Sequence, residues 1–158
     1  MTVPEAKSNW TMRRLAALAG PAALAILLLA GPPASAQPGQ APRVAGKYAA
    51  TFQEVANNCS GMGMSLRTAT IELSQSGERS IQVTVPGVPI MRGTISGAGK
   101  FKADAKRGKT AIEGVDGRFS VAGHFDDKGI QFLFIAEYYR AARPLCTQSW
   151  NASGTRSS

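Results

Sequence analysis

Few of the side chains that enzymes use for catalysis occur in this chain. His124 is the only histidine, and Cys59 and Cys146 are the only cysteines. One histidine excludes a histidine cluster and leaves no redundancy for a His-Cys or His-Asp-Ser site. Asp126 and Asp127 stand in a polar segment that ends in glycine, where aspartate favours a turn. Spacings typical of zinc or calcium ligands are absent. The sequence therefore predicts a protein that is not an enzyme and that has no metal site, catalytic residues or cofactor.

Long apolar runs are also scarce, and the longest one lies near the N-terminus. Three basic residues precede an apolar stretch over 15–30, and an Ala-Ser-Ala sequence ending at Ala36 follows it. This order is typical of a secretory signal peptide. A Gly-Pro pair at 20–21 leaves fewer than the roughly 20 apolar residues of a spanning helix. We expect residues 1–36 to be cleaved, the mature protein to be periplasmic or secreted, and no transmembrane segment to remain after cleavage.

The two cysteines fit this compartment. An even number of cysteines in an exported chain indicates a disulfide. Cys59 and Cys146 lie far apart in the sequence, whereas a redox pair is usually a Cys-x-x-Cys motif. Their disulfide would close most of the domain and, in the chain-entropy model, stabilise it by about 4 to 5 kcal/mol. The sequence therefore predicts a structural Cys59–Cys146 bond.

Acidic residues are outnumbered by basic ones. The chain has 10 Asp and Glu against 18 Lys and Arg, for a formal charge of +8 at pH 7. Such a charge favours loose association with anionic surfaces. The densest basic cluster lacks interleaved aromatic residues, so a single-stranded nucleic-acid platform is not indicated. We expect this cluster to be a solvated edge and the protein not to bind nucleic acid; its members are Lys100, Lys102, Lys106, Arg107 and Lys109.

No segment keeps a helical period, and what is present instead is alternation. The clearest case is the run over 129–139, which is rich in aromatic and β-branched residues. One face would hold Ile130, Phe132, Phe134, Ala136 and Tyr138. The opposite face mixes Gln131 and Glu137 with three apolar side chains, so we expect this strand to be central and to have a partly apolar outer face.

Similar short segments fill the rest of the chain, each followed by a polar or glycine-containing turn. Asp116-Gly117 is the strongest hairpin signal. The pattern predicts a single antiparallel meander that closes into a small all-β up-and-down barrel of eight, or at most nine, strands over 47–152. A two-sheet β-sandwich is the alternative. Residues 37–46 are predicted to be a flexible lead-in and 153–158 a disordered tail. The expected strands are 47–56, 66–74, 81–85, 91–95, 100–105, 110–115, 118–125, 129–139 and 144–150.

The first strand opens with Gly46-Lys47-Tyr48. This sequence resembles the Gly-x-Trp that opens the first strand of lipocalins, with tyrosine in place of tryptophan. The resemblance covers three residues and implies only a shared barrel architecture, of the lipocalin or avidin kind. The mature chain is shorter than a typical lipocalin and has no helix after the barrel.

Two functions follow from this architecture. The first is the binding of a small apolar or amphipathic ligand inside the barrel. Small residues expected on the inner face (Gly93, Ala103, Ala105, Gly114 and Gly123) either relieve strand bending or leave space for it. The ligand would contact the inward aromatic residues, namely Tyr48, Phe52, Phe101, Phe119, Phe132, Phe134 and Tyr138.

The alternative is a non-catalytic interaction module, either an inhibitor or a partner within the cell envelope. It would use the outer face of the central strand. There Leu133, Ile135 and Tyr139 would form an exposed apolar patch.

Overall fold

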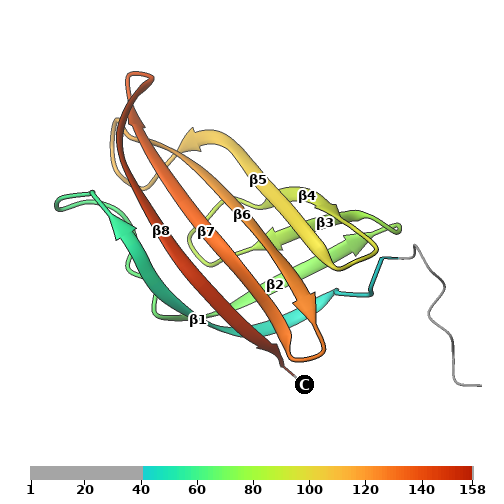
Figure 1. Cartoon of the computed structure of the whole chain (residues 1–158). Helices are drawn as coiled ribbons and strands as arrows, with labels where there is room; N and C mark the ends of the chain where they lie inside the picture. The colour runs from blue at the N-terminus through green and yellow to red at the C-terminus, as the bar shows by residue number, and fades with distance from the viewer. Residues whose placement is uncertain (1–40, 158) are drawn as a thin grey trace, which may run out of the picture. The chain divides into compact units, whose positions relative to one another are not determined.

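The computed structural model describes residues 41–157, which form a ring of eight antiparallel strands (Figure 1). Each strand pairs with its neighbours in sequence, and β1 also pairs with β8, so the sheet has no free edge. The all-β, eight-stranded meander predicted from the sequence is confirmed. The predicted signal peptide lies outside the described residues. The strands are β1 (Gly46–Asn57), β2 (Thr68–Ser76), β3 (Ser80–Thr84), β4 (Met91–Ile95), β5 (Lys100–Lys109), β6 (Asp116–Asp126), β7 (Gly129–Arg140) and β8 (Arg143–Arg156).

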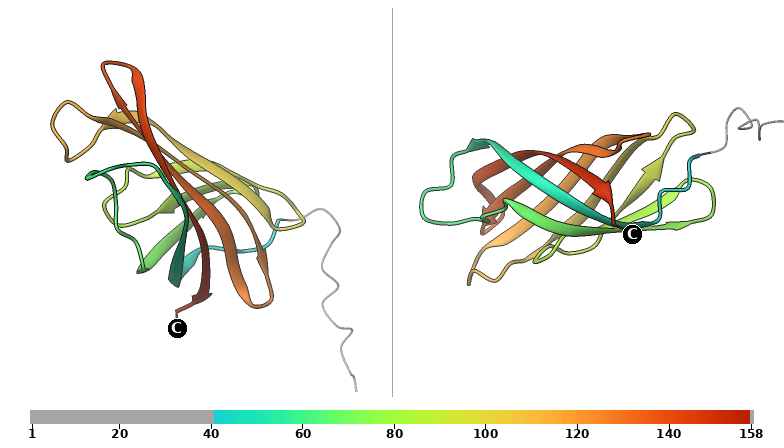
Figure 2. Two further views of the ribbon diagram at one scale, coloured as in Figure 1. Left: turned by 60° about the vertical axis from the view of Figure 1, so that its left-hand side comes forward. Right: turned by 90° about the horizontal axis from the view of Figure 1, so that it is seen from below.

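The two ends of the barrel differ in their connections (Figure 2). At one end the strands are joined by the segments 58–67, 85–90 and 110–115, and by the two-residue turn between β7 and β8. We call this the loop end. At the other, the turn end, the connections are the short turns 77–79, 96–99 and 127–128. Long connections gathered at one end of a rigid barrel are common locations for binding residues.

Side chains follow the predicted alternation. Along β7 the residues from Ile130 to Tyr138 alternate between buried and more exposed positions. The inward residues of neighbouring strands meet them, and aromatic rings contact one another along the barrel. Phe52 lies 5.8 Å from Phe132 between ring centroids, and Phe134 lies 5.4 Å from Trp150. The middle of the barrel is therefore filled by aromatic side chains.

The small inner residues serve close strand approach rather than space. A Cβ built on Gly93 would overlap the carbonyl oxygen of Lys102, and one on Gly123 would overlap that of Gln131. Ala103 and Ala105 are buried in the core. Gly114 lies in the loop between β5 and β6, with φ of 70°. The barrel interior is therefore filled by side chains, and the glycines allow neighbouring strands to bend and to approach each other closely.

Four expected boundaries were wrong. The segment 110–115, which was expected to be a strand, is a loop, in which the Thr110 hydroxyl donates to the Val115 carbonyl oxygen at 2.8 Å. Residues 106–109, which the expected strands 100–105 and 110–115 leave as a turn between them, are instead the end of β5, which reaches Lys109 through a bulge. Asp116-Gly117 begins β6 instead of forming a two-residue turn, because β6 needs its full length to pair with β7. Residues 153–156 belong to β8, where they pair with β1 and β7, and are not a tail.

The predicted lead-in is packed against the turn end from Ala41 onward. Ala41 and Val44 are buried. The backbone N–H of Val44 donates to Gln75 Oε1 at 3.0 Å, and the Val44 carbonyl accepts from the Tyr48 hydroxyl at 2.8 Å. These contacts place the start of the packed domain before Lys47.

Candidate functional site

The segment 58–67, which we call the strap, runs across the loop end from β1 to β2. Cys59 binds it to Cys146 of β8 through a disulfide, as predicted from the sequence. Beside this bond, the Thr147 N–H donates to Asn58 Oδ1 at 2.7 Å, and the Asn58 N–H donates to the Thr147 carbonyl at 3.2 Å. The start of the strap is thus attached to β8 by one covalent bond and two hydrogen bonds.

Gln148 holds the middle of the strap. Its side chain is 2% exposed, and it is the one buried polar side chain in the core of the described part of the chain. Its Oε1 accepts from the Met64 N–H at 2.8 Å, and its Nε2 donates to the Met64 carbonyl at 3.2 Å. The amide therefore pairs with Met64 as a strand backbone would. A buried amide with all its contacts made is stabilising, whereas a lost partner costs about 1 to 3 kcal/mol.

Tyr138 and Gly63 complete this arrangement. The Tyr138 hydroxyl donates to Gln148 Oε1 at 3.4 Å. Burial raises the pKa of Tyr138, so the hydroxyl stays a neutral donor at ordinary pH. Gly63 has φ of 105°, and a Cβ at that position would overlap the Gln148 amide. Glycine is therefore required where the strap passes over Gln148.

On one side of the strap lies a hollow of about 400 Å³, which we call the apolar hollow. Phe119 and Tyr138 contribute from the inner face of the barrel. Lys109 and Thr110 also line it, and Lys109 is exposed. Lys109 makes no ion pair within the described residues. The apolar lining comes from three loops as well as the barrel: Met64, Val88, Pro89, Ile112, Phe119 and Tyr138.

A second hollow of about 630 Å³, the polar hollow, lies on the other side of the strap. Gly63 and Met64 line both hollows, whereas the other strap residues from Gly61 to Arg67 line the polar hollow alone. Phe52 and Trp150 contribute from the core, but the remaining lining includes charged and amide groups, among them Glu54, Asn57, Arg67 and Gln148. The polar hollow is larger than the apolar hollow, but the chemistry of its lining makes it the poorer candidate for a ligand site. Drug-sized ligands favour mainly apolar sites with a few placed polar groups, a description that fits the apolar hollow better.

All seven aromatic residues predicted to contact a ligand are buried. Of these, Phe119 and Tyr138 reach the apolar hollow and Phe52 the polar hollow. Phe132 and Phe134 pack in the filled middle of the barrel. Toward the turn end, Phe125 lies 4.9 Å from Phe101 and 6.0 Å from Tyr48 between ring centroids.

Sequence reasoning missed the loop residues that line the apolar hollow. Met64, Val88 and Ile112 lie between strands and so have no place in a strand pattern. The sequence nonetheless held a signal for these residues. Three separate connections between strands contain apolar side chains, which is unusual for segments that run over a protein surface.

The three residues predicted to bind a partner point outward from β7. Leu133 is 37% exposed, while Ile135 and Tyr139 are half-buried. The Arg107 guanidinium lies over the Tyr139 ring, 4.8 Å from its centroid, as in a cation–π contact. Leu133 is therefore the most exposed apolar group of the three.

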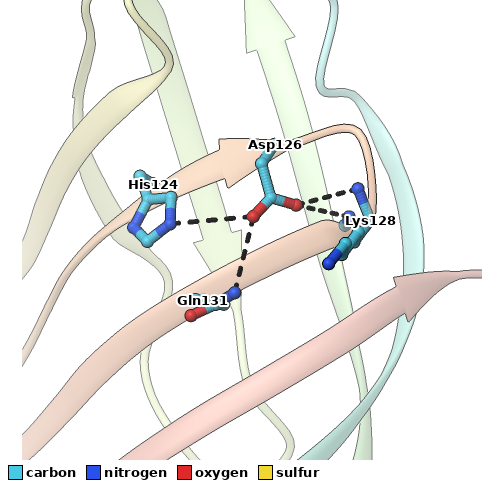
Figure 3. A network of polar contacts seen from close by, with 5 residues as sticks. His124, Asp126, Lys128 and Gln131 are labelled. Carbon is cyan, nitrogen blue, oxygen red and sulfur yellow. Dashed lines mark hydrogen bonds and ion pairs between the residues drawn. The ribbon is translucent and has the colours of Figure 1, made fainter.

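His124 lies in a polar network at the turn end (Figure 3). Its Nε2 is 3.8 Å from Asp126 Oδ2, which also accepts a hydrogen bond from the Gln131 amide at 3.4 Å. The other oxygen of Asp126 accepts from the backbone N–H groups of Lys128 and Gly129. Both side chains of the pair are exposed, and the carboxylate caps the turn. The network organises a hairpin.

Within residues 41–157 the structure contains no cluster of three His, Cys, Asp or Glu side chains that could hold a metal ion. The same residues include no helix of the length and apolarity needed to cross a membrane. No family model matches the chain, and no curated protein or solved structure matches it either. The function must therefore be argued from the site itself.

Proposed function

We propose that the protein binds a small amphipathic ligand at the loop end. The apolar part of the ligand occupies the apolar hollow, and its polar group lies beside Lys109 and Thr110. The observation that carries this proposal is the hollow itself, of about 400 Å³, bounded by barrel and loop residues of mainly apolar character. This volume lies within the range of small-molecule sites.

The location differs from the one expected from the sequence, which placed the ligand inside the barrel. Aromatic contacts fill the interior, so a ligand there would have to displace core side chains. At the loop end only Phe119 and Tyr138 of the predicted residues line the apolar hollow. Met64 gives one wall an adaptable side chain, because methionine has several rotatable bonds and a polarisable sulfur.

Lys109 favours an anionic polar group on the ligand. Its ammonium group is the only charged group among the residues that line the apolar hollow, and it has no ion-pair partner in the described part of the chain. A carboxylate near it would gain a modest, salt-dependent attraction, because the site is open to solvent. The proposed ligand class is therefore a medium-length aliphatic carboxylate or a compound of the same chemistry.

The proposal also places this function outside the cytoplasm. The Cys59–Cys146 bond is compatible with an oxidising compartment, where disulfides form and persist. The basic and apolar composition of the N-terminal residues supports export on sequence grounds.

Isothermal titration calorimetry with dodecanoate and with the neutral dodecanol tests the ligand class. We expect both to bind and Ile112→Asp to weaken both by at least about tenfold, because it puts a charge into the apolar lining. Ile90→Asp is the matched control, since Ile90 is exposed in the segment 85–90 but does not line the hollow. Lys109→Gln should weaken dodecanoate by up to about fivefold and leave dodecanol unchanged. Failure of both probes to bind, or equal effects of Ile112→Asp and Ile90→Asp, would contradict the proposal.

A further inference from the structure

One side of the barrel presents an outer surface built from uncharged side chains, bordered by His124, the register partner of Gln131, and by Asp126, which accepts a hydrogen bond from Gln131. The register aligns uncharged residues across β1, β8, β7 and β6, so that Gln53 pairs with Asn151, Asn151 with Leu133, and Leu133 with Ala122. Parallel rows on either side continue the pattern. The charge-free face consists of Thr51, Gln53, Ser120, Ala122, Gln131, Leu133, Ile135, Ser149, Asn151 and Ser153, all exposed or half-buried.

This composition contrasts with the rest of the outer surface. The chain has 18 Lys and Arg and 10 Asp and Glu, and the outward positions of β5 are Lys100, Lys102 and Asp104. Arg92 on β4 and Glu72 on β2 are likewise exposed. The outward positions of β8 from Thr147 to Thr155 contain only hydroxyl and amide side chains. A basic chain that leaves one broad face without charge has one surface on which electrostatic repulsion between copies is smallest.

We propose that the charge-free face is the interface of a homodimer. In a twofold-symmetric dimer the same patch pairs with itself, and residues near the axis meet their own counterparts, so a patch with many lysines would bring like charges together. Asparagine, glutamine, serine and threonine each donate and accept hydrogen bonds, so two identical faces can pair with each other. Because the closed sheet has no free edge, strand addition is not open to this barrel, and association must use the outer face or an end of the barrel.

Leu133 gives the face an apolar centre. It is 37% exposed and lies between Asn151 and Ala122 in the register. Beside it is a shallow hollow of about 530 Å³, lined by Gln53, Ala122, Leu133 and Asn151 among others, and His124 is the one ionisable residue in its lining. The alanine and serine side chains of the face lose little conformational entropy when they become ordered. Because the face is mainly polar and Leu133 is its one exposed large apolar side chain, we expect a weak dimer of about micromolar affinity.

Sedimentation velocity of the purified, disulfide-bonded protein, from micromolar to submillimolar concentration, tests this inference. We expect a concentration-dependent dimer. Asn151→Lys and Ser153→Lys should each raise its dissociation constant at least about tenfold, since each buries an ammonium group against a face that has no acidic side chain to pair with it. Ser74→Lys is the matched control, because Ser74 is an exposed outward residue of β2 outside the charge-free face. It adds the same charge to the chain and should leave the dimer unchanged.

Three outcomes would overturn the inference. The wild-type protein could stay monomeric throughout, which would leave the face to a different molecule. The dimer could persist in both lysine variants, which would place the interface elsewhere. Ser74→Lys could weaken the dimer as strongly as Asn151→Lys, which would show an effect of net charge alone. Far-UV circular dichroism checks that each variant is folded. Because there are two lysine variants, the inference can still be tested if one of them fails to fold.

Discussion

The two ends of the barrel are closed by different means. At the turn end short turns join the strands, and the apolar side chains of Val44, Tyr48, Phe101 and Phe125 pack together or are buried close by. At the loop end the strap crosses the barrel, and its attachment depends on one disulfide and on the amide of Gln148. One end is therefore closed mainly by apolar packing, and the other by a few specific bonds.

The difference explains why the candidate site is at the loop end. Apolar packing that fills a space leaves no room for a ligand. A strap attached at defined points can cross an opening and leave hollows on both sides of it. Regions with few buried apolar contacts are also the ones that open most easily, which suits ligand entry. Changes at the loop end should therefore affect binding and stability together, whereas changes at the turn end should affect stability alone.

Removal of the disulfide, which attaches the strap at the loop end, should have the largest effect on stability and on ligand binding. Cys59 and Cys146 are separated by 87 residues, and the chain-entropy model gives about 4 to 5 kcal/mol for a loop of this length. We expect the double variant Cys59→Ser/Cys146→Ser to lose about that free energy of unfolding, measured by urea titration. Dodecanoate affinity should fall in the same variant, because the start of the strap is released.

Val44→Ala is the control for the disulfide variant. Val44 is buried at the turn end, so its truncation should lower the free energy of unfolding by about 1 kcal/mol or more without changing dodecanoate affinity. If the disulfide variant kept its stability and its affinity, the strap would not depend on the covalent bond and the comparison would fail.

A smaller effect is expected within the strap, where two glycines form a matched pair. Both Gly61 and Gly63 have positive φ, but a Cβ on Gly61 meets no atom within 4 Å, whereas one on Gly63 overlaps the Gln148 amide. Gly61→Ala should cost about 1 to 2 kcal/mol, the penalty of an alanine in the left-handed region. Gly63→Ala should cost about 3 kcal/mol, because it also disturbs the hydrogen bonds between Gln148 and Met64. Thermal unfolding of the two variants measures the difference, and equal losses would show that Gln148 moves aside without penalty.

The sequence predicted the strands well because strand burial repeats every two residues. The buried positions from Ile130 to Tyr138 could be assigned from alternation alone. The disulfide followed from the cysteine count and the signs of export. Both inferences use local composition and need no knowledge of contacts between distant residues.

Turns and the site were harder to predict. The turn between β7 and β8 is Ala141-Ala142, with φ of 47° and 67°, although such turns favour Asn-Gly. The sequence contains no turn signal at these two positions. Pairing along the two long strands on either side imposes a backbone conformation that alanine does not prefer. The role of Gln148 was hidden for a related reason, because its partner Met64 is 84 residues away.

The smallest predicted effect concerns pH, and here each end of the barrel provides one tyrosine. Burial raises the pKa of Tyr138 at the loop end. Burial also raises the pKa of Tyr48 at the turn end, although the nearby charge of Arg156 and a hydrogen bond to it work in the opposite direction. In the unfolded chain both hydroxyls should titrate near pH 10. The folded state therefore binds these protons more tightly than the unfolded state does.

It follows that this contribution to stability is complete below about pH 10 and is lost as pH rises through the higher pKa of the folded state. Urea titrations on either side of pH 10 should show a loss for the wild-type protein that Tyr138→Phe reduces. Tyr48→Phe should reduce it less, because Arg156 offsets part of the effect of burial at the turn end. Tyr48→Phe/Arg156→Gln, compared with Arg156→Gln alone, isolates that offset, since without the arginine only burial acts on Tyr48. An equal response of Tyr48→Phe and Tyr138→Phe would mean that the charge of Arg156 is screened, and that the two ends bury their hydroxyls alike.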